Sequence, residues 1–361
     1  MRRFLLSLFA VLTASAASAQ QTDKTDPLEL GIFGIGSCHV NNRNAADNAR
    51  WIPQMKDAGL RYYRTAHTLW GTVEPQPGQW HWQELDAQMD YLSAQGMVYG
   101  GIFIGSPDWN KADKPGYMPV NNLAGWSRYV TETVTHCRGR IRRWEVWNEP
   151  PNFTGKDQTP ADYAKLVAAA YDVAKAADPG CVVGLAAKSA PLTYLEQVIT
   201  AGAKDHFDYI TLHPYEILDT VAHNAGTEPV FMNIVPSVRR MLAAVNPAKA
   251  DVPVIFTELG CDAGKGTALQ AQALVKAYTM GAAQGVACIQ WFEGRDGDSG
   301  PKGLLDDKGQ PRPAYTALRE LIARLGQHPE YLGWVPLAGR HRGFLFKGSA
   351  GPVLIAWATS G

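Results

Sequence analysis

The chain has no excess charge of either sign, because its 361 residues include 34 Lys and Arg and 34 Asp and Glu. Charged residues make up only 19% of the chain, whereas hydrophobic residues make up 46%. Nucleic acids and anionic membrane surfaces are bound through clustered cations, so this balance argues against both as partners. The hydrophobic share is large enough for a sizeable core, which argues against intrinsic disorder.

The apolar run at the N-terminus is too short to span a bilayer. It covers residues 4–12, follows Arg2 and Arg3, and precedes small residues at 17–19. This arrangement is typical of a secretory signal that is cleaved after Ala19. We therefore predict a signal peptide over residues 1–19, a periplasmic or secreted mature protein, and no stable membrane anchor.

Cysteine is sparse, and its spacing fits neither a CxxC motif nor a zinc site. Of the five cysteines, Cys181, Cys261 and Cys288 lie in or beside apolar runs. This placement favours buried thiols at these three positions and leaves a disulfide as the alternative.

Motifs of several other enzyme classes are missing. The sequence contains no GxSxG segment, which argues against a serine esterase. His39 and His67 lack the partners of an HxH or HExxH metal site. Residues 264–270 lack the upstream glycine of a phosphate-binding loop. The sequence therefore predicts neither a metal ion nor another cofactor.

Short apolar segments alternate with segments of helical periodicity from residue 28 onward. The predicted strands cover residues 30–36, 60–65, 97–104, 141–148, 181–186, 207–213, 252–257 and 286–292. The predicted helices cover residues 47–58, 82–95, 121–137, 160–177, 191–202, 230–245, 267–284 and 312–325. Eight such units over residues 28–327 predict an α/β fold, the (β/α)8 TIM barrel, as the catalytic domain. A doubly wound open sheet is the alternative, but Gly31, Gly34 and Gly36 do not form its GxGxxG turn.

Residues 328–361 have a different sequence pattern, in which short apolar stretches are separated by Gly and Pro. Three short strands are predicted at 331–335, 343–347 and 352–358. Three strands cannot close a sandwich. We therefore expect a short C-terminal β segment that either packs on the barrel or forms part of a small β domain.

Polar side chains follow several of the predicted barrel strands. In a TIM barrel the reactive groups lie at the carboxyl ends of the strands. The residues placed there are Arg64, Asn148, Glu149, His213, Tyr215, Glu258, Trp291 and Glu293. Glu149 ends the segment WEVWNE, and Glu258 lies in VIFTELG on a distant strand. Two such carboxylates can face one another across a cleft, which is the arrangement that glycoside hydrolysis requires.

The motif WNEP on the fourth strand, with a Glu at the end of the seventh, resembles the retaining (β/α)8 glycoside hydrolases of clan A. The resemblance covers residues 30–325 and includes WIPQMKDAGLRYYR and PQPGQWHWQELDAQMDYLSAQGM. Within the clan the chain is most similar to family 39 and its bacterial exopolysaccharide-hydrolase relatives, and families 5 and 42 share many of these features.

The resemblance implies a role for each matching position. Glu149 matches the acid/base and Glu258 the nucleophile, while Asn148 matches the residue that binds the sugar 2-hydroxyl. Glu258 has to stay charged, whereas Glu149 has to be partly protonated near its working pH. The two carboxyl groups should then lie about 5–5.5 Å apart, because that is the separation of retaining enzymes.

Further positions match supporting residues of the clan. Arg64 matches the arginine that keeps the nucleophile ionised. His213 or Tyr215 matches the residue on strand six that touches the nucleophile, although a lone His213 is also compatible with a structural role. Trp291 matches the aromatic platform beneath the sugar ring.

Other residues at the rim have two interpretations each. Trp70 and Trp109 are predicted sugar platforms or core residues, and His67 lies in a loop that would border the sugar. Glu293 either binds a sugar hydroxyl or pairs with Arg295. Glu145 lies about 13 Å below Glu149 along the strand, at about 3.3 Å per residue, and is predicted to be a buried ion-pair partner of Arg64 or another arginine.

The sequence thus predicts an O-glycosyl hydrolase that cleaves a polysaccharide or oligosaccharide by double displacement. A transglycosylase that remodels an envelope polysaccharide would use the same residues, and an inactive carbohydrate-binding barrel is a further alternative. The sequence does not distinguish an open groove for internal cleavage from a closed pocket for terminal cleavage.

Overall fold

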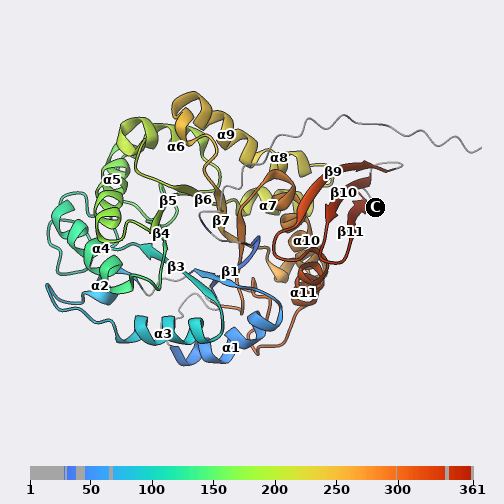
Figure 1. The fold of residues 1–361 in the computed structure, drawn as a ribbon, viewed down its shortest axis with the longest axis horizontal. Helices are drawn as coiled ribbons and strands as arrows, with labels where there is room; N and C mark the ends of the chain where they lie inside the picture. Colours follow the sequence, from blue (N-terminus) through green and yellow to red (C-terminus); the bar gives the residue numbers. More distant parts are fainter. Residues whose placement is uncertain are drawn as a thin grey trace, which may run out of the picture.

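A closed barrel of eight parallel strands forms the body of the protein (Figure 1). The computed structural model describes residues 28, 31–37, 45–64, 68–297, 299–337 and 341–358. The barrel strands are β1 Phe33–Ser37, β2 Tyr62–Arg64, β3 Val98–Phe103, β4 Arg143–Val146, β5 Val182–Lys188, β6 Tyr209–His213, β7 Val254–Leu259 and β8 Cys288–Phe292. β8 pairs with β1, with Phe33 opposite Ile289, so the sheet has no free edge. The predicted (β/α)8 barrel is confirmed. The predicted signal peptide, His39 and His67 lie outside the described residues.

Helices connect the strands and cover the outside of the barrel (Figure 1). They are α1 Ala45–Asp57, α2 Trp70–Val73, α3 Gln83–Ala94, α4 Leu123–Cys137, α5 Pro160–Ala177, α6 Leu192–Val198, α7 Tyr215–His223, α8 Glu228–Met232, α9 Ile234–Val245, α10 Thr267–Gln284 and α11 Pro313–Leu325. α5 begins with a capping box, in which the side chains of Thr159 and Asp162 accept hydrogen bonds from each other's backbone N–H groups.

The connection after β6 differs from the single helix predicted at 230–245. Three helices, α7, α8 and α9, occupy this part of the chain. α7 starts directly after Pro214 and buries Leu218 and Val221, which are spaced three residues apart on one face. This short helix matters for the site because Tyr215 is its first residue.

Large aromatic side chains fill the layer between the barrel and the helices. The ring of Trp144 on β4 stacks on Phe103 of β3 with 4.5 Å between ring centroids. A Cβ at Gly101 would overlap the Trp144 ring, so glycine at this position allows the two strands to pack around it. The eight strands are therefore held by close packing as well as by the hydrogen-bond ladder.

The C-terminal segment forms a three-stranded antiparallel sheet in the order β11-β10-β9. Its strands are β9 Glu330–Pro336, β10 His341–Lys347 and β11 Pro352–Ala358. The indole Nε1 of Trp357 donates a hydrogen bond to Glu228 on α8 at 2.9 Å. The sheet thus packs on the helices of the barrel, as one of the two sequence interpretations predicts.

The cysteines of the described residues lie in the core. Cys137, Cys181, Cys261 and Cys288 are all buried thiols, so the prediction of buried thiols at the last three is confirmed. Burial raises the pKa of Cys181 and Cys261 to about 11. Within the described residues, no helix has the length and apolar character needed to cross a membrane.

Candidate active site

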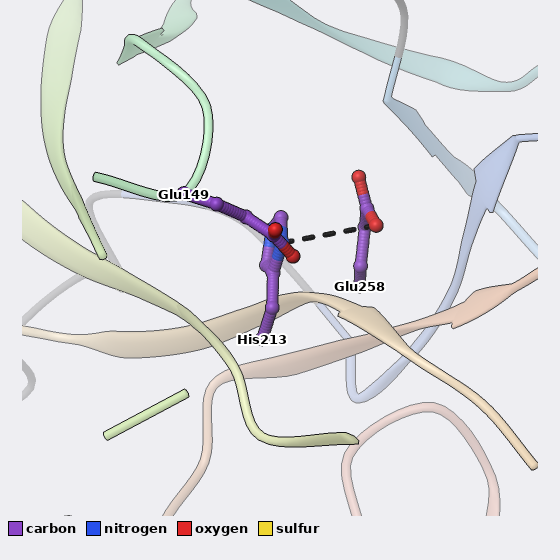
Figure 2. A group of neighbouring side chains, drawn as sticks. All are labelled: Glu149, His213 and Glu258. Atoms are coloured by element: carbon purple, nitrogen blue, oxygen red, sulfur yellow. Dashed lines mark hydrogen bonds and ion pairs between the residues drawn. The ribbon is translucent and has the colours of Figure 1, made fainter. Parts of the chain in front are cut away.

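The backbone after β4 turns sharply and directs Glu149 over the barrel mouth (Figure 2). Trp147 and Glu149 have positive φ angles of 66° and 47°, a region that non-glycine residues rarely occupy. Two hydrogen bonds hold the turn: the Trp147 backbone N–H donates to the Phe103 carbonyl, and the Trp147 indole donates to the Phe153 carbonyl, both at 2.8 Å. This strained turn is the local reason why Glu149 leaves the strand direction.

Glu258 lies on β7 and is held from two sides. Arg64 Nη1 donates to Glu258 Oε1 at 2.6 Å, and the Tyr215 hydroxyl donates to Oε2 at 2.9 Å. The Glu258 side chain remains 15% exposed. The ion pair and the hydrogen bond fix both oxygens of Glu258 in position at the barrel mouth.

Arg64 connects this carboxylate to a buried network below it. Its Nε donates to Glu145 Oε2 at 2.8 Å, and its Nη2 donates to Asn148 Oδ1 at 2.7 Å. Glu145 also accepts a hydrogen bond from Thr211 Oγ1 at 2.7 Å. Burial disfavours the charge of Arg64, but Glu145 and Glu258 outweigh burial and raise its pKa. The predicted ion pair between Glu145 and Arg64 is present.

His213 is buried and joins the two sides of the site. Its Nδ1 lies 2.8 Å from Glu149 Oε1 and 3.7 Å from Glu258 Oε2, and its Nε2 lies 2.9 Å from Thr257 Oγ1. Burial raises the pKa of Glu149, but the hydrogen bond and charge of His213, together with Arg64 and Lys188, lower it further than burial raises it. In the free protein the pKa of Glu149 is therefore shifted in the direction opposite to that expected of a proton donor.

The two carboxylates share one space with His213 (Figure 2). One oxygen of Glu149, one oxygen of Glu258 and one ring nitrogen of His213 all lie within 4.8 Å of one another. These atoms already have protein partners, since Arg64 and Tyr215 contact Glu258, and His213 contacts Glu149. The arrangement leaves two closely spaced carboxylates facing an open cleft.

The cleft above them has a volume of about 710 Å³. Its lining includes five of the residues predicted for the site, which are Asn148, Glu149, His213, Tyr215 and Glu258. Arg64 lies just beneath, in contact with Asn148 and Glu258. These six residues come from four different strands or strand ends, β2, β4, β6 and β7, and the structure brings them together.

Trp291 and Trp70 are not sugar platforms, because both side chains are fully buried. Successive side chains on a strand alternate in direction, so Trp291 points into the core and its neighbour Phe292 lines the cleft. Trp70 stacks on Tyr129 with 5.3 Å between centroids and donates through Nε1 to Glu74. The interpretation of these two indoles as sugar platforms is wrong, and for Trp70 the alternative, a core residue, is confirmed.

Trp109 and Glu293 also lie away from the cleft wall. Trp109 is half-buried, packs edge-on against Trp70 and donates to the Glu74 carbonyl at 2.9 Å. Glu293 is fully buried, accepts the Gly297 N–H at 3.1 Å, and does not pair with Arg295, so neither role predicted for it is correct. Burial, the largest cause, raises the pKa of Glu293 to about 8.

Several residues that line the cleft were not identified from the sequence. They are Asn152, Phe153, Lys188, Phe292 and Lys302. Phe153 lies within the same WEVWNEPPNF segment that identified Glu149, so the motif was a usable signal for it, and Lys188 ends β5, so position at a strand end was a usable signal for that lysine. Lys302 lies on a long loop after β8, where neither periodicity nor a motif indicates the cleft.

The comparisons with known proteins find glycoside hydrolases. The family model Glyco_hydro_42, described as β-galactosidase, matches residues 40–128. The chain is 35% identical over 78 residues to β-galactosidase BgaA from Thermus sp, a match over 20% of this chain and 12% of that protein. It is 29% identical over 118 residues to endo-1,4-β-xylanase A from Phanerodontia chrysosporium, over 30% of this chain and 28% of that protein. The chain thus spans less than a third of either curated relative.

Solved structures share the fold over most of the chain. A family 39 glycoside hydrolase from Bacteroides cellulosilyticus superposes with a TM-score of 0.75 at 19% identity, over 90% of this chain and 70% of that one. GH5_18 from Streptomyces cattleya gives 0.65 at 15% identity, over 81% and 80%. Xylanase 10B from Thermotoga maritima gives 0.58 at 16% identity, over 82% and 95%. The resemblance of this chain to the retaining glycoside hydrolases of clan A is confirmed.

Proposed function

We propose that the protein is a retaining glycoside hydrolase that cleaves O-glycosidic bonds of a polysaccharide or oligosaccharide. The observation that carries the proposal is the pair Glu149 and Glu258. One carboxylate oxygen of each lies within 4.8 Å of the other, and both residues line an accessible cleft. Retaining enzymes hold their carboxyl groups about 5–5.5 Å apart, whereas inverting enzymes leave about 6.5–9.5 Å for a water molecule. The short separation favours attack by a carboxylate over attack by water.

In the first step, a Glu258 oxygen bonds to the anomeric carbon while the bond to the leaving oxygen breaks. Glu149 gives its proton to that oxygen, and a covalent glycosyl–enzyme results. Glu258 loses its charge on forming the ester. In the second step, Glu149 takes a proton from water, the water oxygen bonds to the anomeric carbon, and Glu258 leaves as a carboxylate.

The hydrogen bonds around the pair suit these roles. Arg64 and Tyr215 both contact Glu258 and stabilise its anionic form before attack and after release. Asn148, which Arg64 orients through Oδ1, lines the cleft between the two acids, where a sugar hydroxyl next to the cleaved bond would lie. Glu149 needs a proton from solution, and its 13% exposure allows that exchange.

The test compares Glu258→Gln, Glu149→Ala and the wild type on aryl glycosides and on polysaccharides that include bacterial exopolysaccharides. We expect Glu258→Gln to lose turnover on every substrate, because it removes the nucleophile. Glu149→Ala should retain turnover on aryl glycosides with acidic leaving groups, which need little protonation, and lose it on polysaccharides.

Glu132→Gln is the matched control, since Glu132 is an exposed acid on α4. It should leave the rates unchanged, and circular dichroism should show all three variants folded. Equal losses for Glu149→Ala on activated and unactivated substrates would contradict the division of roles. Retention of anomeric configuration is checked by NMR of the first product formed, and inversion would refute Glu258 as nucleophile.

We further propose that the protein is exported, on the basis of the signal-like residues 1–19. Expression of the full chain in a bacterial host followed by N-terminal sequencing of the periplasmic fraction tests this. A mature N-terminus at Gln20 is the expected result.

A further inference from the structure

The cleft has two chemically different sides. The part of the wall that α7 and the loops after β7 and β8 contribute carries three acids, Glu216, Asp219 and Asp262, and two lysines, Lys265 and Lys302. The part that β5 and the loop after β4 contribute, where Glu149 lies, carries Asn152, Phe153 and Lys188 and no further acid among the described residues. Because the proton donor must reach the leaving oxygen, the sugar on the leaving side binds next to Glu149 under the proposed function.

Phe153 is a large apolar side chain that the fold leaves open in this cleft. It is 62% exposed, although its position is fixed by the indole of Trp147, which donates to its carbonyl at 2.8 Å. Its φ of 51° is one that a phenylalanine rarely adopts, so the surrounding turn enforces it. An exposed aromatic ring on a fixed backbone position in a polar cleft is suited to stack on the apolar face of a sugar ring.

Lys188 is the cation on the same side. It is the last residue of β5, its backbone N–H donates to the Pro150 carbonyl at 3.1 Å, and its side chain is half-buried in the cleft wall. Its charge is near enough to Glu149 to contribute to the lowered pKa of that carboxyl. Among the described residues no carboxylate forms an ion pair with Lys188, whereas Lys265 across the cleft is paired with Asp219 at 3.0 Å.

We propose that Phe153 and Lys188 form the leaving-side subsite for a sugar that carries a carboxylate. The ring of Phe153 stacks on the sugar, and the ammonium of Lys188 pairs with its carboxylate. The proposal rests on the proposed function for the assignment of this side to the leaving group. It makes the substrate an acidic polysaccharide.

A sugar carboxylate bound to Lys188 would also favour protonation of Glu149, the proton donor. Once Lys188 is paired, its positive charge no longer acts on Glu149 alone, and the bound sugar also removes water from Glu149. Both changes favour the protonated carboxyl that the first step requires. Of the other groups that act on Glu149, His213 lies within hydrogen-bond distance of it on β6, and Arg64 acts through its charge from β2.

Binding is measured with Glu258→Gln, so that turnover does not affect the result. The probes are pectate, alginate and xanthan, each paired with its carboxyl-reduced form, which keeps the linkage and loses the charge. We expect at least one acidic probe to bind about 5- to 10-fold more tightly than its reduced form, as for one partly desolvated ion pair. The preference should weaken with added salt.

Further substitutions in the Glu258→Gln protein show which side chain causes the preference for the acidic form of a probe. Lys188→Gln should abolish it, Lys188→Arg should keep it, and Phe153→Ala should weaken binding of both forms alike. Lys308→Gln, at an exposed lysine outside the cleft lining, is the matched charge control and should keep the preference. Equal or tighter binding of every reduced form, binding of none of the acidic probes, or a preference that survives Lys188→Gln would overturn the proposal.

Product analysis with the wild type, on a polysaccharide in which acidic and neutral sugars alternate, tests the side of the cut. The released fragment should begin with the acidic sugar at its new non-reducing end, and an acidic sugar only at the other new end would overturn the proposal. Cleavage of neutral polysaccharides only would refute this subsite and leave the proposed function standing. Binding with the expected Lys188 dependence but no cleavage would refute the proposed function and leave the carboxylate site supported.

Discussion

Arg64 is the residue through which the buried and the accessible parts of the site depend on each other. Its guanidinium contacts Glu145, Asn148 and Glu258 at the same time. A planar fork of five donors can serve three acceptors at fixed angles, which a lysine ammonium cannot do. Glu145 is only 2% exposed, so its charge requires this partner.

Replacing Arg64 with Met should therefore affect stability and activity together. The substitution leaves the buried Glu145 without its cation, and we expect a loss of about 3–5 kcal/mol in the free energy of unfolding. The double variant Arg64→Met/Glu145→Gln removes the buried charge as well and should recover part of that loss in urea denaturation. It should not recover kcat, because Glu258 still lacks its guanidinium partner; recovery of kcat would contradict the role of Arg64.

Glu293 should make the stability depend on pH with a negative slope. Its pKa of about 8 in the folded protein lies above the ordinary value of 4.5. Below about pH 4.5 the carboxyl is protonated in both states, whereas between about 4.5 and 8 only the unfolded chain loses the proton. The free energy of unfolding should thus fall as pH rises, by about 1.4 kcal/mol per unit from this group.

Glu293→Gln is the variant that tests this dependence. Urea denaturation at several pH values should show a flatter profile for Glu293→Gln than for the wild type, with the largest stabilisation near pH 8. Glu132→Gln, which removes an exposed acid, should keep the wild-type slope. Parallel profiles for Glu293→Gln and the wild type would contradict the buried neutral carboxyl.

At the scale of elements, the ends of β7 and β8 set the position of the nucleophile. Gly260 follows β7 and packs so closely that a Cβ there would overlap the backbone carbonyl oxygen of Phe292. A backbone atom cannot rotate away as a side chain can, so the two strand ends would have to separate. Glu258 lies only two residues before this contact, and Phe292 lines the same cleft.

Gly260→Ala should accordingly lower both stability and kcat. We expect a loss of about 1–3 kcal/mol in urea denaturation, typical of overpacking, and a fall in kcat that exceeds any change in KM. Gly78→Asn is the control, because no atom lies within 4 Å of a Cβ there and asparagine tolerates the positive φ of 76°. A Gly260→Ala variant with wild-type kcat would show that the strand ends do not fix Glu258.

At the scale of the whole molecule, the C-terminal sheet and the barrel are joined through Trp357. Besides its hydrogen bond to Glu228, its ring lies under the Lys276 ammonium at 5.6 Å, and Lys276 pairs with Glu228 at 3.1 Å. Glu228 is 1% exposed, so these two partners compensate its burial. The contact lies on the helical layer and not at the cleft.

Trp357→Phe should therefore destabilise the protein without changing catalysis. Loss of the indole donor to a buried carboxylate should cost about 1–3 kcal/mol in thermal or urea unfolding, with kcat/KM unchanged. Trp334→Phe is the matched control, since Trp334 lies on β9 of the same sheet and is 52% exposed. A change in kcat/KM for Trp357→Phe would show that the sheet influences the active site.

The barrel and its central residues could be predicted because they depend on local patterns. Apolar strands, helices with capping residues such as Thr159, and a polar residue at each strand end are all visible in the sequence. The rule that strand ends meet at one rim then brings Arg64, Glu149 and Glu258 together without further information. The single helix predicted at 230–245 overlaps α8 and α9 and misses α7, because short helices such as α8, of five residues, have too few turns to show periodicity.

The sequence by itself therefore determined the fold class and the two carboxylates, because period and motif are properties of neighbouring residues. Only the tertiary structure decided which aromatic residues meet the cleft. Trp291 and Phe292 differ by one position on a strand, and alternation buries the first and exposes the second to the cleft. Likewise, the lowered pKa of Glu149 depends on His213, 64 residues away in the chain and 2.8 Å away in space. Such distances are set by packing across the barrel, which no local pattern records.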